Sequence, residues 1–385
     1  MADKGPLGIY VHIPFCKKKC LYCDFLSAPA TKGVIEDYVT ALCARIGKEK
    51  ETYREYLVRT VFFGGGTPSL LTVAQLEKIM TRLRENFALA KDAEITLEAN
   101  PGTLDEKKLA GYRRLGINRL SIGLQSAHDE ELSALGRIHT REEFLQNYAA
   151  ARKAGFSNIN VDLMSALPGQ TTERWRDTLR QVAELSPEHI SAYSLMIEEG
   201  TPFWERYGKT ANPPGFLALP TEEEERLMYE ETESILRQYG YHRYEISNYA
   251  KPGRECLHNT GYWKRTDYAG FGLGAASLVD NVRWKNTDDL AEYLDPEKPC
   301  RMECRTLSCT EQMEEFMFLG LRLSSGVAVA DFRRCFRTGI WDIYGPILKR
   351  LEQDGLILLY EDDKKIRLTA KGVDLSNYVL AQFLL

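Results

Sequence analysis

The chain has 385 residues, of which 44% are hydrophobic and 27% are charged, so it can bury one large core and has room for a second, smaller domain. Its formal net charge of −5 argues against general nucleic-acid binding. No apolar run approaches the length that spans a membrane, and the first residues lack a basic stretch leading into an apolar one. We therefore expect a cytoplasmic protein.

Three of the nine cysteines stand close together just after an apolar, β-branched run at 8–14. Cys16, Cys20 and Cys23 have the spacing C-x3-C-x2-C, and each thiolate can bind one iron of a cubane cluster while the fourth iron keeps no protein ligand. A structural zinc site favours four protein ligands, and Phe25 stands where a further cysteine could have helped. The alternative is three thiols in a loop that form a disulfide or a weak zinc site.

After this loop, apolar β-rich runs alternate with helical patterns six times. Such alternation predicts an α/β fold with a parallel sheet, either open or curled into a barrel, whose strands are joined by right-handed crossovers. The expected strands are 8–14, 60–64, 94–99, 119–125, 158–163 and 189–196, and the expected helices are 34–50, 73–87, 105–115, 141–154, 173–184 and 222–239.

Three helix starts carry a threonine followed three residues later by a glutamate, the pattern of a capping box. In such a box the hydroxyl and the carboxylate each satisfy a backbone amide of the first turn. The pattern occurs at Thr103-x-x-Glu106, Thr140-x-x-Glu143 and Thr221-x-x-Glu224.

Polar residues follow several of the expected strands at their carboxyl ends, where parallel sheets and barrels place their chemistry. Gly65, Gly66 and Thr67 belong to a glycine run whose backbone can approach a small zwitterion closely, and the run lacks the spacing and the lysine of a phosphate loop. Glu98, Gln125 and Asp162 stand at the ends of later strands. Each of them has a structural alternative as a turn, cap or satisfied amide, but their recurrence at one edge favours a site.

A second candidate site is the segment His258-Asn259-x-x-Tyr262-Trp263. His258 could give an imidazole to heme iron, and Tyr262 and Trp263 could pack against a porphyrin face. The alternative is a packed, hydrogen-bonded histidine beside an aromatic pair. Cys256 is another possible ligand, although a lone cysteine is usually packed.

The last part of the chain changes character from about residue 310. Helical patterns at 311–323, 329–336 and 343–353 precede a hairpin, 356–360 and 365–369 across Asp362-Asp363-Lys364, in an order that resembles a winged helix. Residues 311–385 contain ten Lys and Arg against eleven Asp and Glu, so the positive charge of a DNA-binding face is missing and we expect a lid or docking module. The expected units are a barrel domain over 1–295, a linker over 296–309 and this domain over 310–385.

The cysteine spacing is, as it stands, the signature of the radical S-adenosylmethionine (SAM) superfamily. The resemblance implies a partial (β/α)6 TIM-like barrel and a [4Fe–4S] cluster on Cys16, Cys20 and Cys23 whose open iron is chelated by SAM. It also implies that SAM is held by residues matching the SAM site of oxygen-independent coproporphyrinogen III oxidases. These residues are Tyr10, Tyr22, Gly65, Gly66, Thr67, Glu98, Gln125, Arg137 and Asp162.

Longer blocks resemble the oxidase-like proteins of the HemW type, which are heme chaperones. The blocks are 9–16, 62–69, 97–102, 117–126, 135–139, 160–168 and 244–249. The resemblance implies that the chain binds heme through the segment His258, Asn259, Tyr262 and Trp263. It further implies that heme is delivered to hemoproteins, including ones at the membrane.

Two departures separate the chain from the true oxidase, whose cysteine motif continues to a further cysteine and which has an N-terminal extension. Phe25 stands at that position, and only fifteen residues precede Cys16. The resemblance therefore makes oxidase activity doubtful. Oxygen-independent coproporphyrinogen III oxidation, or another radical SAM reaction on a small substrate, stays open as the alternative function.

Overall fold

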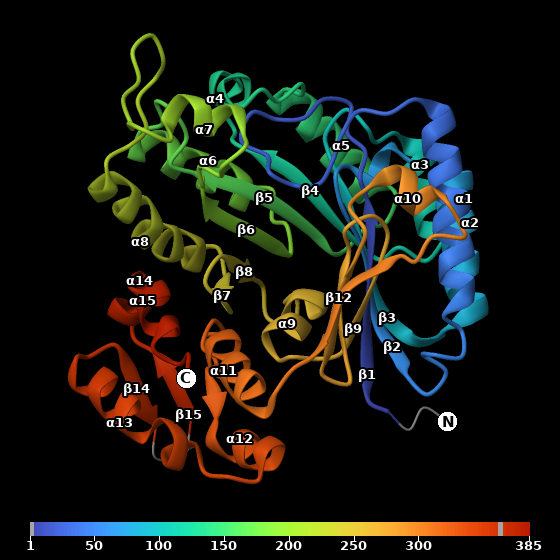
Figure 1. The fold of residues 1–385 in the computed structure, drawn as a ribbon. Coiled ribbons are helices and arrows are strands. Elements are labelled where there is room, and N and C mark those ends of the chain that lie inside the picture. The colour runs from blue at the N-terminus through green and yellow to red at the C-terminus, as the bar shows by residue number, and fades with distance from the viewer. Residues whose placement is uncertain (1–3, 361–364) are drawn as a thin grey trace.

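The computed structural model describes residues 4–360 and 365–385 and is built around one large sheet (Figure 1). Six strands lie side by side in chain order, all parallel, and helical crossovers join them as parallel pairing requires. This arrangement confirms the predicted α/β fold and its partial (β/α)6 barrel. The strands are β1 (Pro6–Ile13), β2 (Leu57–Gly65), β3 (Ala88–Ala99), β4 (Arg119–Gln125), β5 (Ile159–Ser165) and β6 (His189–Ser194).

The crossover helices begin where local chemistry satisfies their first amides. Thr140 with Glu143 and Thr221 with Glu224 form the predicted capping boxes. The box predicted at Thr103 is wrong, because the Asp105 carboxylate accepts the Lys108 N–H and caps that helix instead. The helices are α1 (Lys32–Lys48), the 3₁₀ turn η1 (Pro68–Leu70), α2 (Val73–Asn86), α3 (Glu106–Arg114), α4 (Asp129–Ala134), α5 (Arg141–Lys153), α6 (Thr172–Glu184), α7 (Pro202–Tyr207) and α8 (Glu222–Gln238).

Strands that follow α8 extend the sheet at both edges. Strands β7 (His242–Arg243) and β8 (Asn248–Ala250) add antiparallel beside β6, whereas β9 (Tyr268–Phe271) adds parallel to β1. The glycine- and alanine-rich stretch 270–277 contains the turn between β9 and β10. The short helix α9 (Leu257–Trp263) stands between these two additions, and the remaining elements are β10 (Ala276–Val279), β11 (Val282–Asn286), α10 (Leu290–Leu294) and β12 (Arg301–Thr306).

Strand β12 lies within the stretch 296–309 that is expected to be a linker. It pairs antiparallel with β11 and forms the edge of the twelve-stranded sheet, although all six of its residues are exposed. An exposed strand with charged residues gives little apolar signal, which is why its sequence suggested a linker. The expected division into domains over 1–295 and 310–385 stays a prediction.

The C-terminal unit has its own sheet and core. Its strands pair in the order β13-β15-β14 beside helices in a winged-helix-like arrangement, and Phe332, Tyr344 and Leu348 are fully buried in it. The turn predicted at Asp362-Asp363-Lys364 lies outside the described residues. The elements are α11 (Cys309–Gly320), β13 (Val327–Ala328), α12 (Val329–Phe336), α13 (Ile340–Gln353), β14 (Ile357–Tyr360), β15 (Lys365–Leu368), α14 (Ala370–Asp374) and α15 (Ser376–Ala381).

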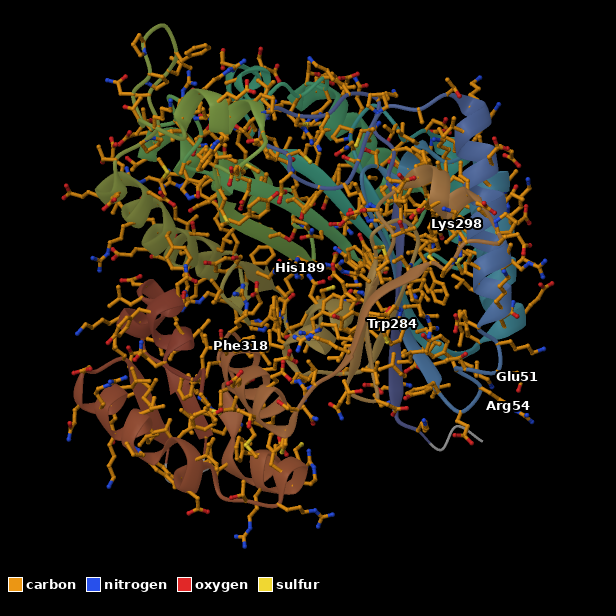
Figure 2. All side chains as sticks on the ribbon, viewed as in Figure 1. Glu51, Arg54, His189, Trp284, Lys298 and Phe318 are labelled. Carbon is orange, nitrogen blue, oxygen red and sulfur yellow. The ribbon has the colours of Figure 1, made fainter. Side chains whose placement is uncertain are left out.

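Side chains fill the space between the sheet and its helices, and part of this filling is polar (Figure 2). His189, labelled near the middle of that view, is fully buried on β6. Its Nδ1 lies 2.6 Å from Asn160 Oδ1 and its Nε2 lies 2.9 Å from the Tyr244 hydroxyl. In the described part of the chain, no helix combines the length and apolar character needed to cross a bilayer.

Candidate functional site

A cavity of about 330 Å³ opens at the carboxyl ends of the parallel strands, and we call it the central cavity. The loop after β1 and the ends of β2 to β6 surround it, because the carboxyl ends of parallel strands meet at one edge. It brings together twelve of the predicted residues: Cys16, Cys20, Tyr22, Cys23, Gly65, Gly66, Thr67, Glu98, Gln125, Arg137, Asp162 and Asn259.

The cysteine loop is tied to its surroundings by backbone and side-chain hydrogen bonds. Cys16 donates its backbone N–H to Ala28 O (3.1 Å), and Cys23 donates to Cys20 O (3.3 Å). The Thr67 hydroxyl lies 3.5 Å from Cys16 Sγ, and an Arg137 N–H lies 3.7 Å from Cys20 Sγ. All three thiols are free and half-buried, and burial raises the pKa of the Cys23 thiol.

No group of three or more His, Cys, Asp or Glu side chains among residues 4–360 and 365–385 is arranged to hold a single metal ion.

The glycine run forms a narrow edge of the central cavity. A Cβ at Gly65, whose φ is +110°, would lie 2.4 Å from the His12 ring, and one at Gly66 would lie 2.7 Å from Phe15 O. Both positions therefore exclude a side chain, so the backbone itself forms this edge of the cavity. The Gly65 N–H donates to Glu98 Oε2 (3.2 Å) and the Gly66 N–H donates to Ile13 O (2.9 Å). An Asn100 amide N–H binds Thr67 Oγ1 (2.9 Å), which fixes the last residue of the run.

Two carboxyl groups in the central cavity have raised pKa values. Burial and the nearby charge of Asp162 raise the pKa of Glu98 to about 8, and one backbone hydrogen bond, from Gly65 N–H (3.2 Å), opposes this rise. Burial also raises the pKa of Asp162, although its oxygens accept from Asn160 (2.7 Å) and Ser121 (3.3 Å). The cavity can thus present a neutral carboxyl near pH 7.

Gln125 ends β4 with φ of +70°, an uncommon value for a residue other than glycine. Its Oε1 is buried and has no hydrogen-bond partner among the described residues. Arg137 uses three of its five N–H donors within the protein, because it binds Asn100 Oδ1 (2.8 Å), Gly123 O (2.6 Å) and Cys20 Sγ (3.7 Å). Both side chains therefore keep hydrogen-bonding capacity for a ligand in the cavity they line.

The two tyrosines predicted beside the cysteine loop have different surroundings. Tyr22 lines the central cavity, and burial raises the pKa of its hydroxyl. Tyr10 stacks on Phe62 with ring centroids 6.3 Å apart, and its hydroxyl lies 2.9 Å from His12 Nδ1. Tyr10 therefore packs beneath the cavity edge and is absent from the lining.

Sequence reasoning missed Ser121 on β4 and five further lining residues. They come from β4, β6 and the segment that leads into β8, where no spaced motif signals them: Gly123, Ser191, Tyr193, Ser247 and Asn248. Four of these six were visible indirectly, because they belong to blocks that resemble the oxidase-like proteins: Ser121 and Gly123 to 117–126, and Ser247 and Asn248 to 244–249. The Asn248 Oδ1 atom is buried without a partner in the described structure.

The predicted heme segment divides between two places. Asn259 lines the central cavity, whereas His258 and Tyr262 line a separate cavity of about 240 Å³ at the amino ends of β1 and β2, which we call the amino-end pocket. His258 is only 4% exposed, and its Nδ1 and Nε2 lie 2.8 and 2.9 Å from the hydroxyls of Thr60 and Tyr262. Burial lowers its pKa to about 3.

Trp263, the last residue of the segment, lies on another side of α9. The Arg322 guanidinium covers its ring at 4.4 Å from the centroid. The described side chains thus do not present His258, Tyr262 and Trp263 to one ligand. In this conformation, both imidazole nitrogens of His258 are engaged.

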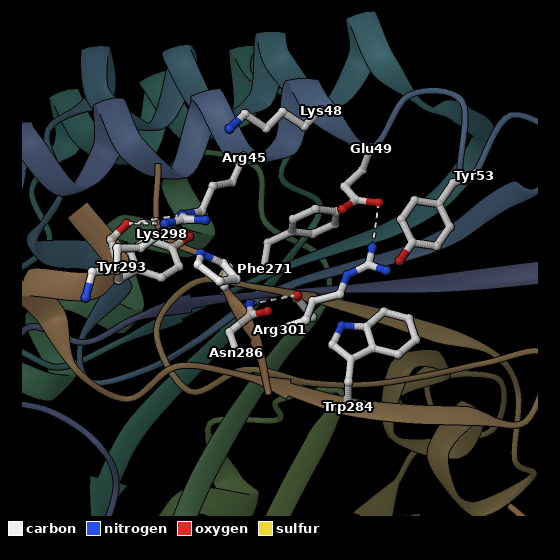
Figure 3. A pocket seen from close by; sticks show the side chains of 13 residues that line it. Arg45, Lys48, Glu49, Tyr53, Phe271, Trp284, Asn286, Tyr293, Lys298 and Arg301 are labelled. Atoms are coloured by element: carbon white, nitrogen blue, oxygen red, sulfur yellow. Dashed lines mark hydrogen bonds and ion pairs between the residues drawn. The ribbon is translucent and has the colours of Figure 1, made fainter. Parts of the chain in front are cut away.

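Another cavity, of about 240 Å³, lies between α1 and the strands β9 to β12 (Figure 3). Its cations already have protein partners: Arg45 donates to Tyr293 O (2.8 Å), and Arg301 lies 2.7 Å from Glu49 and stacks on Trp284 at 4.5 Å. None of the predicted site residues lines it. These contacts connect α1 to the added strands, so a structural role explains the charged residues of this cavity.

Comparison with known proteins gives the family. The Radical SAM superfamily model matches residues 10–182, and the HemN C-terminal domain model matches residues 307–375. The Heme chaperone HemW of Lactococcus lactis subsp. lactis (strain IL1403) is 38% identical over 383 residues, which cover 99% of this chain and 98% of the relative. The chain belongs to the HemW family of the radical SAM superfamily.

Two further matches, one in sequence and one in structure, describe what the HemW-family chain resembles. The Heme chaperone HemW of Escherichia coli (strain K12) is 42% identical over 281 residues, which cover 72% of each chain. The structure "Coproporphyrinogen III oxidase (HemN) from Escherichia coli" superposes with a TM-score of 0.84 at 27% identity, over 98% of this chain and 90% of that one. The barrel and the C-terminal unit of this HemW-family chain are therefore shared with that oxidase.

Proposed function

We propose that the protein is a cytoplasmic heme chaperone that carries a [4Fe–4S] cluster on Cys16, Cys20 and Cys23 and binds SAM beside it. The supporting observation is that the three thiols share one cavity with the partnerless Gln125 oxygen and the carboxyl of Glu98. The relatives named heme chaperones match almost the whole chain, which supports heme as the cargo. When bound, such a cluster supplies the electron that cleaves the sulfonium of SAM reductively.

The residues of the central cavity fit these groups. The backbone edge at Gly65 and Gly66 would receive the amino-acid part of SAM, because no Cβ fits there. Glu98 would hydrogen-bond ribose hydroxyls, accepting when ionised and donating when protonated. Gln125 Oε1 would accept a donor from SAM. Arg137 would orient Cys20 and Asn100 with three of its five N–H donors, and the remaining donors would bind the carboxylate of SAM.

The heme part of the proposal is tested by titrating hemin into anaerobically reconstituted protein, with and without SAM. We expect a heme-dependent absorbance change at about one equivalent, and delivery from the loaded protein to an apo-hemoprotein, including membrane-bound recipients. Absence of any heme-dependent absorbance change would refute the chaperone function. The same titration of His258→Ala, with 5′-deoxyadenosine monitored, tests whether His258 is an axial ligand.

A second candidate function is oxygen-independent coproporphyrinogen III oxidation, favoured by the superposition on the Escherichia coli oxidase. Phe25, 62% exposed at the mouth of the central cavity, stands where the resemblance places a further cysteine in the oxidase. We therefore expect no protoporphyrinogen after anaerobic incubation with reductant, SAM and coproporphyrinogen III. Formation of protoporphyrinogen would establish the enzyme instead.

The C-terminal unit completes the proposal as a docking module rather than a nucleic-acid binder. Its buried Glu315 lies 3.0 Å from Arg265 and 2.7 Å from Arg283, so this one carboxylate is shared by two of the nearby cations at the contact with the barrel. We expect no salt-sensitive retention of the protein on immobilised DNA.

A further inference from the structure

The Asn259 side chain faces the central cavity without a hydrogen bond to any described residue. The cavity also contains the partnerless oxygens of Gln125 and Asn248, both buried. A buried amide oxygen without a partner is costly, and a polar ligand that donates to it removes that cost. The two buried oxygens, with the half-buried Asn259 amide beside them in the lining, therefore mark a part of the cavity that can form hydrogen bonds to a ligand.

Asn259 owes its position to the way α9 is fastened to the barrel. The Glu94 carboxylate, on β3, accepts the backbone N–H groups of Leu257 (3.2 Å) and His258 (3.1 Å), and the Cys256 thiol lies 3.6 Å from it. The His258 ring is fixed at both nitrogens by the hydroxyls of Thr60 and Tyr262. Because Asn259 follows His258 directly, these bonds set where its amide stands.

A second route connects His258 to the cavity edge. Its ring stacks on Phe62 with centroids 5.1 Å apart, and Phe62 in turn stacks on Tyr10. Both rings would lie 3.0 Å from a Cβ at Gly64, and Glu98 Oε2 would lie 3.2 Å from it, so these groups are in close contact. Glu98 then accepts the Gly65 N–H. The packed column runs from His258 to the backbone that lines the cavity.

We propose that Asn259 contacts the ligand of the central cavity and that His258 is a positioning residue for this cavity, acting through Asn259 and through the Phe62–Tyr10 column. The inference rests on the proposed SAM site. It assigns the His258-Asn259 pair to the binding of SAM rather than of heme. Loss of His258 should therefore weaken SAM binding and leave the ligands of the heme iron unchanged. Figure 1 shows α9 between the barrel strands and α11, where it can serve this role.

The test measures SAM affinity of the reconstituted full-length protein in two ways: equilibrium dialysis with labelled SAM, and the change in the electron paramagnetic resonance spectrum of the reduced cluster on SAM addition. We expect Asn259→Ala and His258→Ala each to weaken SAM binding roughly tenfold, the effect of one lost hydrogen bond. His258→Gln, which can still bond a hydroxyl, should recover part of the loss. The exposed Asn377→Ala in the C-terminal unit is the matched control.

The heme spectrum of the same variants separates the alternatives. We expect His258→Ala to give the wild-type Soret position with hemin, because both of its nitrogens serve the protein. Wild-type SAM affinity in Asn259→Ala or His258→Ala would overturn the inference, and so would a shifted Soret band in His258→Ala. If His258→Ala loses iron and sulfide or fails to fold, the same SAM measurements are made on Asn259→Ala and on Thr60→Val. Thr60→Val removes one hydrogen-bond partner of the His258 ring, and wild-type SAM affinity in both variants would overturn the inference. A wild type that binds SAM but not hemin would refute the chaperone function alone.

Discussion

The central cavity and the amino-end pocket lie at opposite ends of the same strands. Their candidate ligand-binding side chains differ in how many hydrogen bonds they make to the protein. In the central cavity, Gln125 and Asn248 keep partnerless oxygens and Glu98 has one hydrogen bond. In the amino-end pocket, both nitrogens of the predicted ligand His258 are paired with hydroxyls, although the Thr260 hydroxyl there is buried without a partner among the described residues. Unsatisfied groups cost stability and are retained where a ligand uses them, whereas satisfied groups stabilise the fold. Changes in the two places should therefore have different consequences.

The largest effect is expected at the cysteine loop. Cys23→Ser should remove nearly all iron and sulfide from the reconstituted protein, because the cubane then loses one of its three protein ligands. The exposed Cys304→Ser is the matched control and should keep the wild-type iron and sulfide content and visible absorbance. Retention of the full cluster in Cys23→Ser would contradict the assignment of the three ligands.

Glu98 should make stability depend on pH. Its pKa is raised from 4.5 to about 8, so the folded protein binds a proton that the unfolded chain releases between these values. The free energy of unfolding should thus fall as the pH rises through this window, by a few kcal/mol in all, since each pH unit between the two pKa values contributes about 1.4 kcal/mol. Glu98→Gln cannot titrate and should lack this component.

The measurement is the thermal unfolding midpoint of wild type and Glu98→Gln, both without cluster or SAM, between pH 5 and 9. The difference between the two proteins should change in favour of the variant as the pH rises, and it should level off above the folded pKa. Parallel curves for the two proteins would show that Glu98 has no raised pKa.

A smaller effect is expected in the amino-end pocket. Tyr262→Phe removes the hydroxyl that faces His258 Nε2 and leaves a buried nitrogen without a partner, which should lower the free energy of unfolding by about 1–3 kcal/mol. Denaturant unfolding of the cluster-free protein measures this loss. The control is Tyr378→Phe, at a tyrosine that is 51% exposed, for which we expect a change below about 0.5 kcal/mol. Equal stability of the two variants would mean that water replaces the lost hydroxyl.

The sequence predicted the six parallel strands and the cavity at their carboxyl ends because both leave local signals. Each buried strand is a short apolar run, and Glu98 and Gln125 stand where such a run ends, whereas Asp162 lies in the middle of β5. The thiols, the glycines and these side chains then meet because parallel strands share one carboxyl edge. The thiols and the strand residues among the twelve predicted lining residues share one cavity because of that geometry, whereas Asn259 reaches it from α9.

What the sequence could not predict depends on contacts between distant segments. His258 and Asn259 are neighbours in one motif, yet the first turn of a helix sends them to different cavities, and only the position of α9 against β2 and β3 decides which. Thr103 lost its predicted capping role because its hydroxyl donates to Asn100 O (2.6 Å), while Asp105 stands closer to the helix start. Strand β12 is recognisable only through its pairing with β11.

The smallest effect on stability is expected where α9 meets the C-terminal unit. Trp263 belongs to the same motif as His258 but lines neither the central cavity nor the amino-end pocket, so a change there should affect stability alone. Arg322 stacks on the Trp263 ring and lies 3.9 Å from the buried Glu245. Arg322→Met keeps the apolar stem and removes the charge, so we expect a loss of about 0.5–1 kcal/mol in unfolding free energy. Arg334→Met, at a largely exposed ion pair with Asp331, should cost less than about 0.5 kcal/mol. A loss of SAM or heme binding in Arg322→Met without a loss of stability would contradict this view, because it would make the interface with the C-terminal unit part of a binding site.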